Sequence, residues 1–227
     1  QLVFGGWDLF TDDMFVAATK AGVLDAATLT PVAKELAAIK PMSPVYDPAY
    51  VKNLKAAAPK KGKTKWDLAQ QVIADIESFK KKHGCERAVM LWCGSTEVLP
   101  PNAQCHEDAE SFERGLKNND PAIPPSMIYA YAAIMTKTAY GNGAPNLSAD
   151  TPAMVELSEA FGVPVCGKDF KTGQTLMKTT IAPMLKARML ALTGWYSTNI
   201  LGNRDGEVLD DPGSFKTKEK SKMSVLD

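Results

Sequence analysis

The most regular pattern of apolar and polar positions lies between residues 64 and 84. Apolar side chains recur there at the spacing of one helix face, at Leu68, Val72, Ile76 and Phe79. Thr64 and Asp67 form a capping pair at the start, and Gly84 provides a stop. The apolar run at 87–93 predicts a buried strand. A helix followed by such a strand is typical of an α/β sheet.

The chain before this helix predicts one shorter unit and a long loop. Residues 2–4 predict a short strand that leads into a Gly-Gly pair, and 11–21 predict a helix with Thr11 as its candidate cap. Residues 41–63 carry four prolines and a lysine-rich run, and this predicts a long surface loop. Because the chain opens as a strand already in progress, we expect a fragment of a longer protein.

The second half alternates between helical patterns and short apolar runs. Helices are predicted from Pro125 to about Thr138, near 152–161 and over 174–186. Between them we expect a loop at 140–146 and a short strand at 163–166, and after the last helix an apolar strand at 188–200. The fold class is therefore α/β.

Composition and charge exclude several classes of protein. The 26 basic and 26 acidic side chains cancel, so we expect no general attraction to nucleic acid or to an anionic membrane. Apolar runs stay well short of the roughly 20 residues that a membrane-spanning helix needs. Four cysteines and two histidines lack metal-site spacing, which predicts no metal and reduced thiols in the cytoplasm.

Three loops carry candidate chemistry, each with an ordinary structural alternative. Gly94-Ser95-Thr96-Glu97 ends a predicted strand, where α/β sheets bind ligands, but it would also serve as a turn before the next element. Thr172-Gly173-Gln174 opens a helix and could hold an anion on its backbone N–H groups, or be an ordinary Thr cap. The stretch 162–168 resembles a P-loop but has Asp169 where Ser or Thr must follow, so we exclude a nucleotide triphosphate site.

The tail adds two lysines four residues apart, Lys218 and Lys222. In a helix they share a face, where two ammonium groups repel unless water, an acid or an anion lies between them. A loop at 199–206 places two amides and a carboxylate just before them.

Together these segments resemble the 1L-myo-inositol-1-phosphate synthase family. The motifs occur in the family's order over nearly the whole chain: GWD at 6–8, VYDP at 45–48, LWCGSTE at 91–97, PPSMIYA at 124–130, NGAP at 142–145, KDFKTGQT at 168–175, SxNxLGNRDG at 197–206 and KTKEKSK at 216–222. The chain departs from the family pattern at Ala144, Lys168 and Arg204, and it contains no Gly-rich dinucleotide fingerprint.

The resemblance implies a Rossmann-type NAD-binding domain with an inserted α+β domain for catalysis and oligomerisation. By this resemblance, residues 1–123 belong to the NAD-binding domain and 124–227 to the catalytic and oligomerisation domain. The implied enzyme is an isomerase of inositol and phospholipid biosynthesis, a cytoplasmic homotetramer. It converts glucose 6-phosphate by NAD-dependent oxidation, enolisation, aldol cyclisation and reduction.

The resemblance also assigns residues to each part of the site. The implied active-site lysines are Lys218 and Lys222. The implied NAD contacts are Asp8, Val45, Ser95, Thr96, Asp169, Asn203 and Asp205. The implied substrate contacts are Thr172, Gly173, Gln174, Asn199 and Leu201. Two rival interpretations remain at this point: an NAD-dependent sugar-phosphate dehydrogenase, and a non-catalytic oligomerising fragment.

Overall fold

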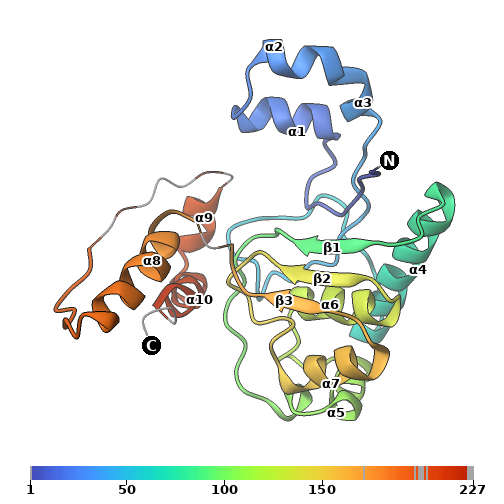
Figure 1. Ribbon diagram of the computed structural model, residues 1–227. Helices are drawn as coiled ribbons and strands as arrows, with labels where there is room; N and C mark the ends of the chain where they lie inside the picture. Colours follow the sequence, from blue (N-terminus) through green and yellow to red (C-terminus); the bar gives the residue numbers. More distant parts are fainter. Residues whose placement is uncertain (1, 171, 197, 199–201, 203, 224–227) are drawn as a thin grey trace.

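A parallel sheet of three strands lies at the centre of the computed structural model, which describes residues 2–170, 172–196, 198, 202 and 204–223 (Figure 1). The strands are β1 (Val89–Trp92), β2 (Ala139–Asn142) and β3 (Val165–Gly167), in the order β1-β2-β3. Val89 pairs with Ala139, and Tyr140 pairs with Val165. Helix and parallel sheet therefore combine as the α/β prediction requires.

Helices pack against the sheet and against one another to form the main core. They are α4 (Lys65–His83), α5 (Ala109–Lys117), α6 (Pro125–Met135) and α7 (Pro152–Phe161), with the 3₁₀ turn η2 (Gln104–His106) before α5. Ten consecutive residues of α6, from Pro125 to Ile134, are buried. A helix that is apolar all round is stable only when neighbours cover every face, and α4, α7 and β2 all contact α6.

The helix ends in this core follow the local sequence. The Thr64 side chain accepts from the Asp67 N–H at 3.1 Å, and Asp67 accepts in turn from the Thr64 N–H, so the predicted capping box is confirmed. Gly84 ends α4 in the left-handed conformation, at φ 62°, which glycine adopts without steric cost. The predicted helix at 152–161 is confirmed as α7.

The N-terminal segment forms a small helical lobe beside the sheet (Figure 1). It contains α1 (Met14–Ala21), α2 (Ala26–Leu29), η1 (Thr30–Val32) and α3 (Ala33–Ala37). Asp13, rather than Thr11, caps α1, because its carboxylate accepts from the Val16 N–H at 2.9 Å. The predicted strand at 2–4 is wrong, and the extended pairing in this region is a single bridge between Trp7 and Met42.

The segment 41–63 is a loop, as predicted, but it does not stay on the surface. Val45, Tyr50, Val51 and Leu54 are buried, and the last two pack against Val208 near the C-terminus. The prolines prevent regular structure, but the apolar side chains between them are still buried away from water. This loop thereby fixes the C-terminal part of the chain against the sheet region.

The structure corrects three further predictions, one about the burial of a strand that does form and two about where strands lie. The run at 87–93 forms β1, but Val89 and Leu91 lie on an exposed face of the sheet, so the strand is buried on one face only. The expected loop at 140–146 begins with residues of the central strand β2. Among the described residues of 188–200, none lies in a strand.

A C-terminal group of three helices lies on the side toward which the strands point (Figure 1). It comprises α8 (Gly173–Ala187), α9 (Asp205–Leu209) and α10 (Pro212–Met223). Sheet and core join residues from both sides of the expected boundary between 1–123 and 124–227, so within this chain the boundary crosses a single sheet.

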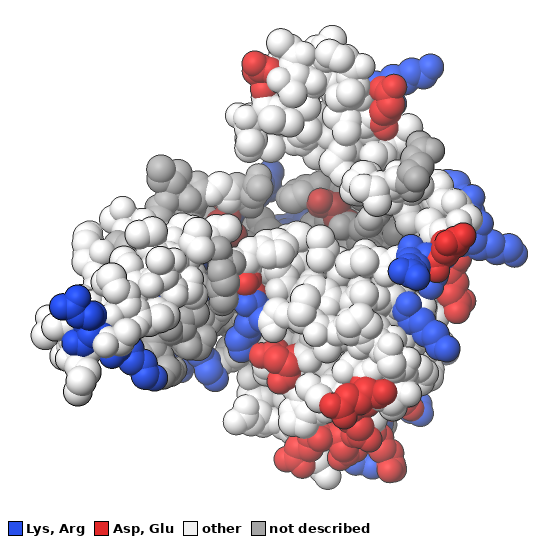
Figure 2. Space-filling model, viewed as in Figure 1, with Lys and Arg blue, Asp and Glu red and all other residues white. Residues whose placement is uncertain are grey.

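Charged side chains are distributed in patches of both signs. Figure 2 shows acidic side chains over the α5 and α7 end of the molecule, and basic ones near α4 and over the C-terminal helices. No helix among the described residues has the length and apolar character needed to cross a membrane.

Candidate active site

The loops that follow β1 and β2 are held together at the carboxyl edge of the sheet. Asn146 joins them, because its amide nitrogen donates to the Ser95 carbonyl at 3.2 Å and its amide oxygen accepts from the Glu97 N–H at 2.9 Å. Asn142, the last residue of β2, donates to the Asn146 carbonyl at 2.7 Å. Neither asparagine was among the candidate site residues, although the NGAPN run after an apolar stretch was a usable signal.

The GSTE loop places one side chain at the sheet edge and another against a helix start. Ser95 is half-buried at the edge where parallel sheets bind ligands, and Thr96 is buried. Glu97 turns inward and accepts hydrogen bonds from the backbone N–H and the hydroxyl of Ser126, in the first turn of α6. Burial raises the pKa of Glu97 to about 7, although the Ser126 hydrogen bonds lower it. Glu97 is therefore an internal helix cap, whereas Ser95 lies at the edge.

Tyr129 of α6 brings the N-terminal segment to the same region. Its hydroxyl accepts from the Val45 N–H at 2.9 Å, and its ring packs against Trp7 and Trp92, with centroids 5.1 and 5.2 Å away. Asp8 follows Trp7, is exposed, and accepts from the Phe10 N–H at 2.9 Å. Asp8 and Val45 are thus carried toward the end of β1 by aromatic contacts.

Asp169 follows β3 and connects the sheet edge to the C-terminal helices. Its N–H donates to the Ala144 carbonyl at 3.0 Å, and its carboxylate accepts from the Ser221 hydroxyl of α10 at 3.3 Å. Asp169 has φ 61°, a region that Asp tolerates better than most residues. Lys168, one of the departures from the family pattern, forms an ion pair with Asp150 at 2.8 Å.

The two tail lysines lie on α10 and point to different partners. The Lys218 ammonium group is 2.9 Å from the Asp205 carboxylate, and the Lys222 ammonium group is 3.1 Å from the hydroxyl of Thr175 in α8. The condition under which the pair shares a helix is met, since both lysines lie in α10. Lys222 thereby reaches the first turns of α8, close in sequence to the Thr172-Gly173-Gln174 turn.

The N-terminal turn of α8 has no side-chain cap and has space beside it. Thr172 makes no side-chain capping hydrogen bond, so the interpretation of this residue as an ordinary Thr cap is wrong. Gly173 has φ 52°, and a Cβ at this position would meet no atom within 4 Å. The Thr172 N–H donates to the Phe170 carbonyl and the Thr175 N–H to the Thr172 carbonyl, so Gly173 is the position at which this turn offers a backbone donor and space to an anion.

Three of the implied contacts, Asn199, Leu201 and Asn203, lie outside the described residues. The described residues of the implied site fall into two connected groups. The first, at the sheet edge, contains Asp8, Val45, Ser95, Thr96 and Asp169. The second, on the C-terminal helices, contains Thr172, Gly173, Gln174, Asp205, Lys218 and Lys222. The hydrogen bond from Ser221 to Asp169 joins the two groups.

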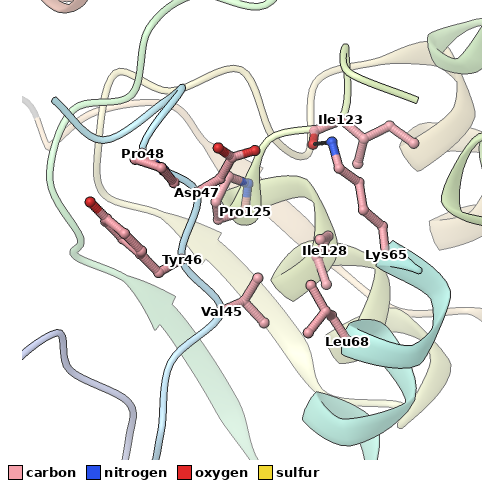
Figure 3. A pocket seen from close by; sticks show the side chains of 9 residues that line it. All are labelled: Val45, Tyr46, Asp47, Pro48, Lys65, Leu68, Ile123, Pro125 and Ile128. Carbon is pink, nitrogen blue, oxygen red and sulfur yellow. Dashed lines mark hydrogen bonds between the residues drawn. The ribbon is translucent and has the colours of Figure 1, made fainter. Parts of the chain in front are cut away.

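Two small pockets lie near these groups. Figure 3 shows the first, where Val45, Asp47 and Lys65 line the cavity beneath the 44–48 segment. The Lys65 ammonium group donates to the carbonyls of Asp120 and Ile123, both at 2.7 Å, so it fixes a loop rather than a ligand. The second pocket separates α10 from the loops at the sheet edge and is lined in part by Pro145, Lys168, Thr217 and Ser221.

Thr175, Lys178 and Ser221 were not singled out from the sequence. In the structure Thr175 and Lys178 of α8 contact Lys222 and Met223 of α10, and Ser221 of α10 contacts Asp169. Thr175 and Lys178 are three residues apart and fully or almost fully buried. Their helical spacing was visible in the sequence, but a buried lysine is not expected from composition alone.

Comparison with known proteins places this arrangement in a family. A family model described as myo-inositol-1-phosphate synthase, of the NAD-binding type, matches residues 1–209. Inositol-3-phosphate synthase 1 of Bacteroides thetaiotaomicron is 53% identical over 100% of this chain and 53% of that protein. The inositol-3-phosphate synthase of Trypanosoma brucei brucei is 33% identical over 100% of this chain and 44% of that protein.

A solved structure agrees with the sequence matches. The crystal structure of inositol-3-phosphate synthase from Caenorhabditis elegans superimposes with a TM-score of 0.93 at 30% identity, over 100% of this chain and 45% of that one. The chain spans about half the length of the curated relatives it matches. Because the family model covers most of the chain, this chain belongs to the myo-inositol-1-phosphate synthase family, and residues 1–209 match the NAD-binding model of that family.

Proposed function

We propose that this chain is the part of an inositol-3-phosphate synthase that holds NAD and two of the active-site lysines, with glucose 6-phosphate as the substrate. The observation that carries the proposal is the meeting of Lys218, Lys222, Asp205 and Asp169 beside the carboxyl edge of the sheet. Two lysines of α10, a carboxylate of α9 and a carboxylate that follows β3 converge there from three separate segments. Such a group suits a reaction in which protons move and sugar oxygens become negative.

The residues present fit NAD by position and by chemistry. Asp8, Val45, Ser95, Thr96 and Asp169 lie around the carboxyl edge, where open α/β sheets bind dinucleotides. Two buried polar atoms in the described part of the chain have no hydrogen-bond partner, the Trp92 indole nitrogen at the end of β1 and the Ser214 hydroxyl on α10. NAD, when bound, supplies a hydride acceptor and later a hydride donor, so that the overall conversion is redox-neutral.

The chain's own residues are assigned to binding and proton transfer. The opening turn of α8, with Thr172, Gly173 and Gln174, would hold the substrate phosphate, and Lys222 would add a full positive charge. Lys218, oriented by Asp205, would stabilise negative charge on a sugar oxygen or return a proton to it. Asp205 is also an implied NAD contact, so the pair would couple the cofactor and the substrate.

The finer features implied by the resemblance belong to the same proposal. They are the inserted α+β domain, the domain division at 123/124, the homotetramer, the cytoplasmic location and the link to phospholipid biosynthesis. The group of α8, α9 and α10, set apart from the main core, supports a separate catalytic part (Figure 1).

A chimera tests the proposed function. In this chimera, called the complemented synthase below, the chain replaces the matching 53% of the Bacteroides thetaiotaomicron protein. The whole of this chain aligns with that part. With glucose 6-phosphate and NAD we expect inositol phosphate without net NADH. Stoichiometric NADH and no inositol phosphate would instead identify a sugar-phosphate dehydrogenase, and neither product would favour a non-catalytic oligomerising module.

A further inference from the structure

Lys178 is the most deeply buried lysine in the described part of the chain that has no oxygen acceptor assigned to it. Its side chain lies in α8 and is 3% exposed. The ammonium group contacts the Met223 sulfur at 3.7 Å and lies 5.7 Å from the centre of the Trp195 ring. No carboxylate among the described residues lies within ion-pair distance of it.

Other lysines that reach into the protein are fully matched by oxygen acceptors. Lys60 pairs with Asp75 at 2.7 Å, and Lys65 donates to two carbonyls. A sulfur atom and an aromatic ring are weak partners by comparison. Burying an ammonium group without an anion is strongly unfavourable, so a site built in this way is suited to receive one.

The surroundings show where the anion would lie. Lys178 and Thr175 occupy adjacent turns on one buried face of α8, and the ends of α10 meet that face: Lys222 contacts Thr175, and Met223 contacts Lys178. Two lysines from two helices therefore meet in one buried interface. Their mutual repulsion falls when an anion with several acceptor oxygens lies between them.

The opening turn of α8 lies fewer than two helical turns before Lys178, and Thr175, the partner of Lys222, follows it directly. Lys178 follows Thr172 by six residues, a rise of about 9 Å along the helix. Side chains of a helix lean toward its N-terminus, so the Lys178 stem extends toward that turn. An anion held at the Gly173 N–H would thus have Lys222 on its solvent side and Lys178 on its buried side.

We propose that Lys178 binds the phosphate group of the sugar-phosphate substrate, together with Lys222 and the N-terminal turn of α8. The identity of the molecule that bears the phosphate rests on the proposed function, whereas the phosphate site itself rests on the buried ammonium group. Lys178 touches the substrate at a group that does not react, so its contribution is to binding more than to the chemical step.

Thermal unfolding of the chain with inorganic phosphate as the probe tests the site directly. A ligand that binds only the folded state raises Tm by an amount that grows with the logarithm of its concentration relative to Kd, so Kd follows from a phosphate titration. We expect Lys178→Met to raise the Kd for phosphate roughly ten- to a hundredfold, as for a lost charge-assisted hydrogen bond. Lys178→Arg, which keeps the charge, should bind within about tenfold of the original chain.

Two further measurements separate binding from a structural role. Without phosphate, Lys178→Met should unfold at the same or a higher temperature, because an unmatched buried charge is removed. A lysine needed only for packing would lower Tm and leave the phosphate affinity unchanged. Lys186→Met, at an exposed position of the same helix, is the matched control and should alter neither quantity. If Lys178→Met does not fold, Lys178→Gln carries the same test.

The complemented synthase separates this inference from the proposed function. There, Lys178→Met should raise KM for glucose 6-phosphate at least tenfold, with a smaller change in kcat and an unchanged affinity for NAD. Phosphate binding that depends on Lys178 in a protein that makes no inositol phosphate would sustain the phosphate site and reject the function. Normal turnover and KM in Lys178→Met, or no phosphate binding by the original chain, would overturn the inference.

Discussion

The ammonium group of Lys218 lies 2.9 Å from the carboxylate of Asp205, across the turn between α9 and α10. The family resemblance assigns Asp205 to NAD and Lys218 to catalysis, so this ion pair connects the two halves of the proposed site. Both side chains retain some exposure, and partly exposed pairs contribute little to stability. The arrangement of the pair is therefore better explained by orientation of the lysine than by folding.

Lys218→Ala in the complemented synthase should lower kcat by at least a hundredfold, because a positioned proton donor or oxyanion partner contributes about 10²–10⁴-fold to the rate. The circular dichroism spectrum and Tm should remain close to those of the original protein. Lys216→Ala, at an exposed position of the same helix, is the control. A variant that keeps more than about a tenth of the original kcat would remove Lys218 from the mechanism.

Lys222→Met should raise the Kd for glucose 6-phosphate at least tenfold in the complemented synthase and change the Kd for NAD by less than about twofold. The reason is that the helix terminus alone contributes only roughly 0.3–1 kcal/mol, so firm binding of the phosphate needs a full charge. Isothermal titration with each ligand gives both values. Unchanged affinity for the sugar phosphate would place its phosphate away from the α8 opening.

Glu97 should make the chain less stable as the pH rises from about 4.5 to 7. The pKa of this carboxyl is 4.5 in its ordinary state and is raised to about 7 in the fold by burial, so the folded state binds the extra proton. The stability that this proton provides is fully present below pH 4.5, the ordinary pKa, and is lost as the pH rises through the folded-state pKa of about 7. Over this window the change from Glu97 is about 3 kcal/mol.

Glu97→Gln is the variant that tests this pH dependence. Its amide can still meet the Ser126 N–H and hydroxyl but does not titrate. Urea unfolding at several pH values should show that the downward slope of the unfolding free energy between these pKa values is reduced in the variant. An identical slope in both proteins would assign the effect to other groups.

Thr64→Ala should reduce the free energy of unfolding by about 1 kcal/mol, because it removes the acceptor for the Asp67 N–H at the start of α4. Chemical denaturation measures this difference. Thr19→Ala in α1 is a suitable comparison, since the Thr19 hydroxyl is exposed and only donates back to the Phe15 carbonyl. Equal losses in the two variants would show that the capping box has no special role.

The 227-residue chain by itself should bind NAD weakly and form no inositol phosphate, because its sequence contains no Gly-rich fingerprint for the pyrophosphate. Isothermal titration of the chain with NAD provides the measurement, and the complemented synthase is the positive control. Micromolar binding of NAD by the chain alone would show that the residues at the sheet edge suffice for the cofactor.

The sequence alone determined the elements whose signals are local. The Thr64 and Asp67 pair, the apolar stripe of α4 and the Gly84 stop lie within one stretch and act through neighbouring turns, so they could be interpreted without the fold. The same holds for α7, with Thr151 at its start and Gly162 at its end. Motif order likewise identified the family without coordinates.

Strands and burial were decided by contacts between distant segments. Ala139–Asn142 contains a glycine and an asparagine and favours a turn locally, but it forms the central strand because β1 and β3 pair with it on both sides. Leu91 belongs to an apolar run and is nevertheless exposed, because no described element covers that face of β1. Pairing and cover are properties of the assembled sheet, which no local pattern contains.

The site depended most on the tertiary structure. Asp169 and Ser221 are 52 residues apart, and Lys178 and Met223 are 45 apart, yet each pair is in contact. The sequence supplied the residue types and, through the family motifs, most of their expected roles. Only the packing of α8 against α10 buries Lys178 and brings the Lys222 ammonium group to the same face of α8. Burial and the closeness of two positive charges arise only when helices meet in space.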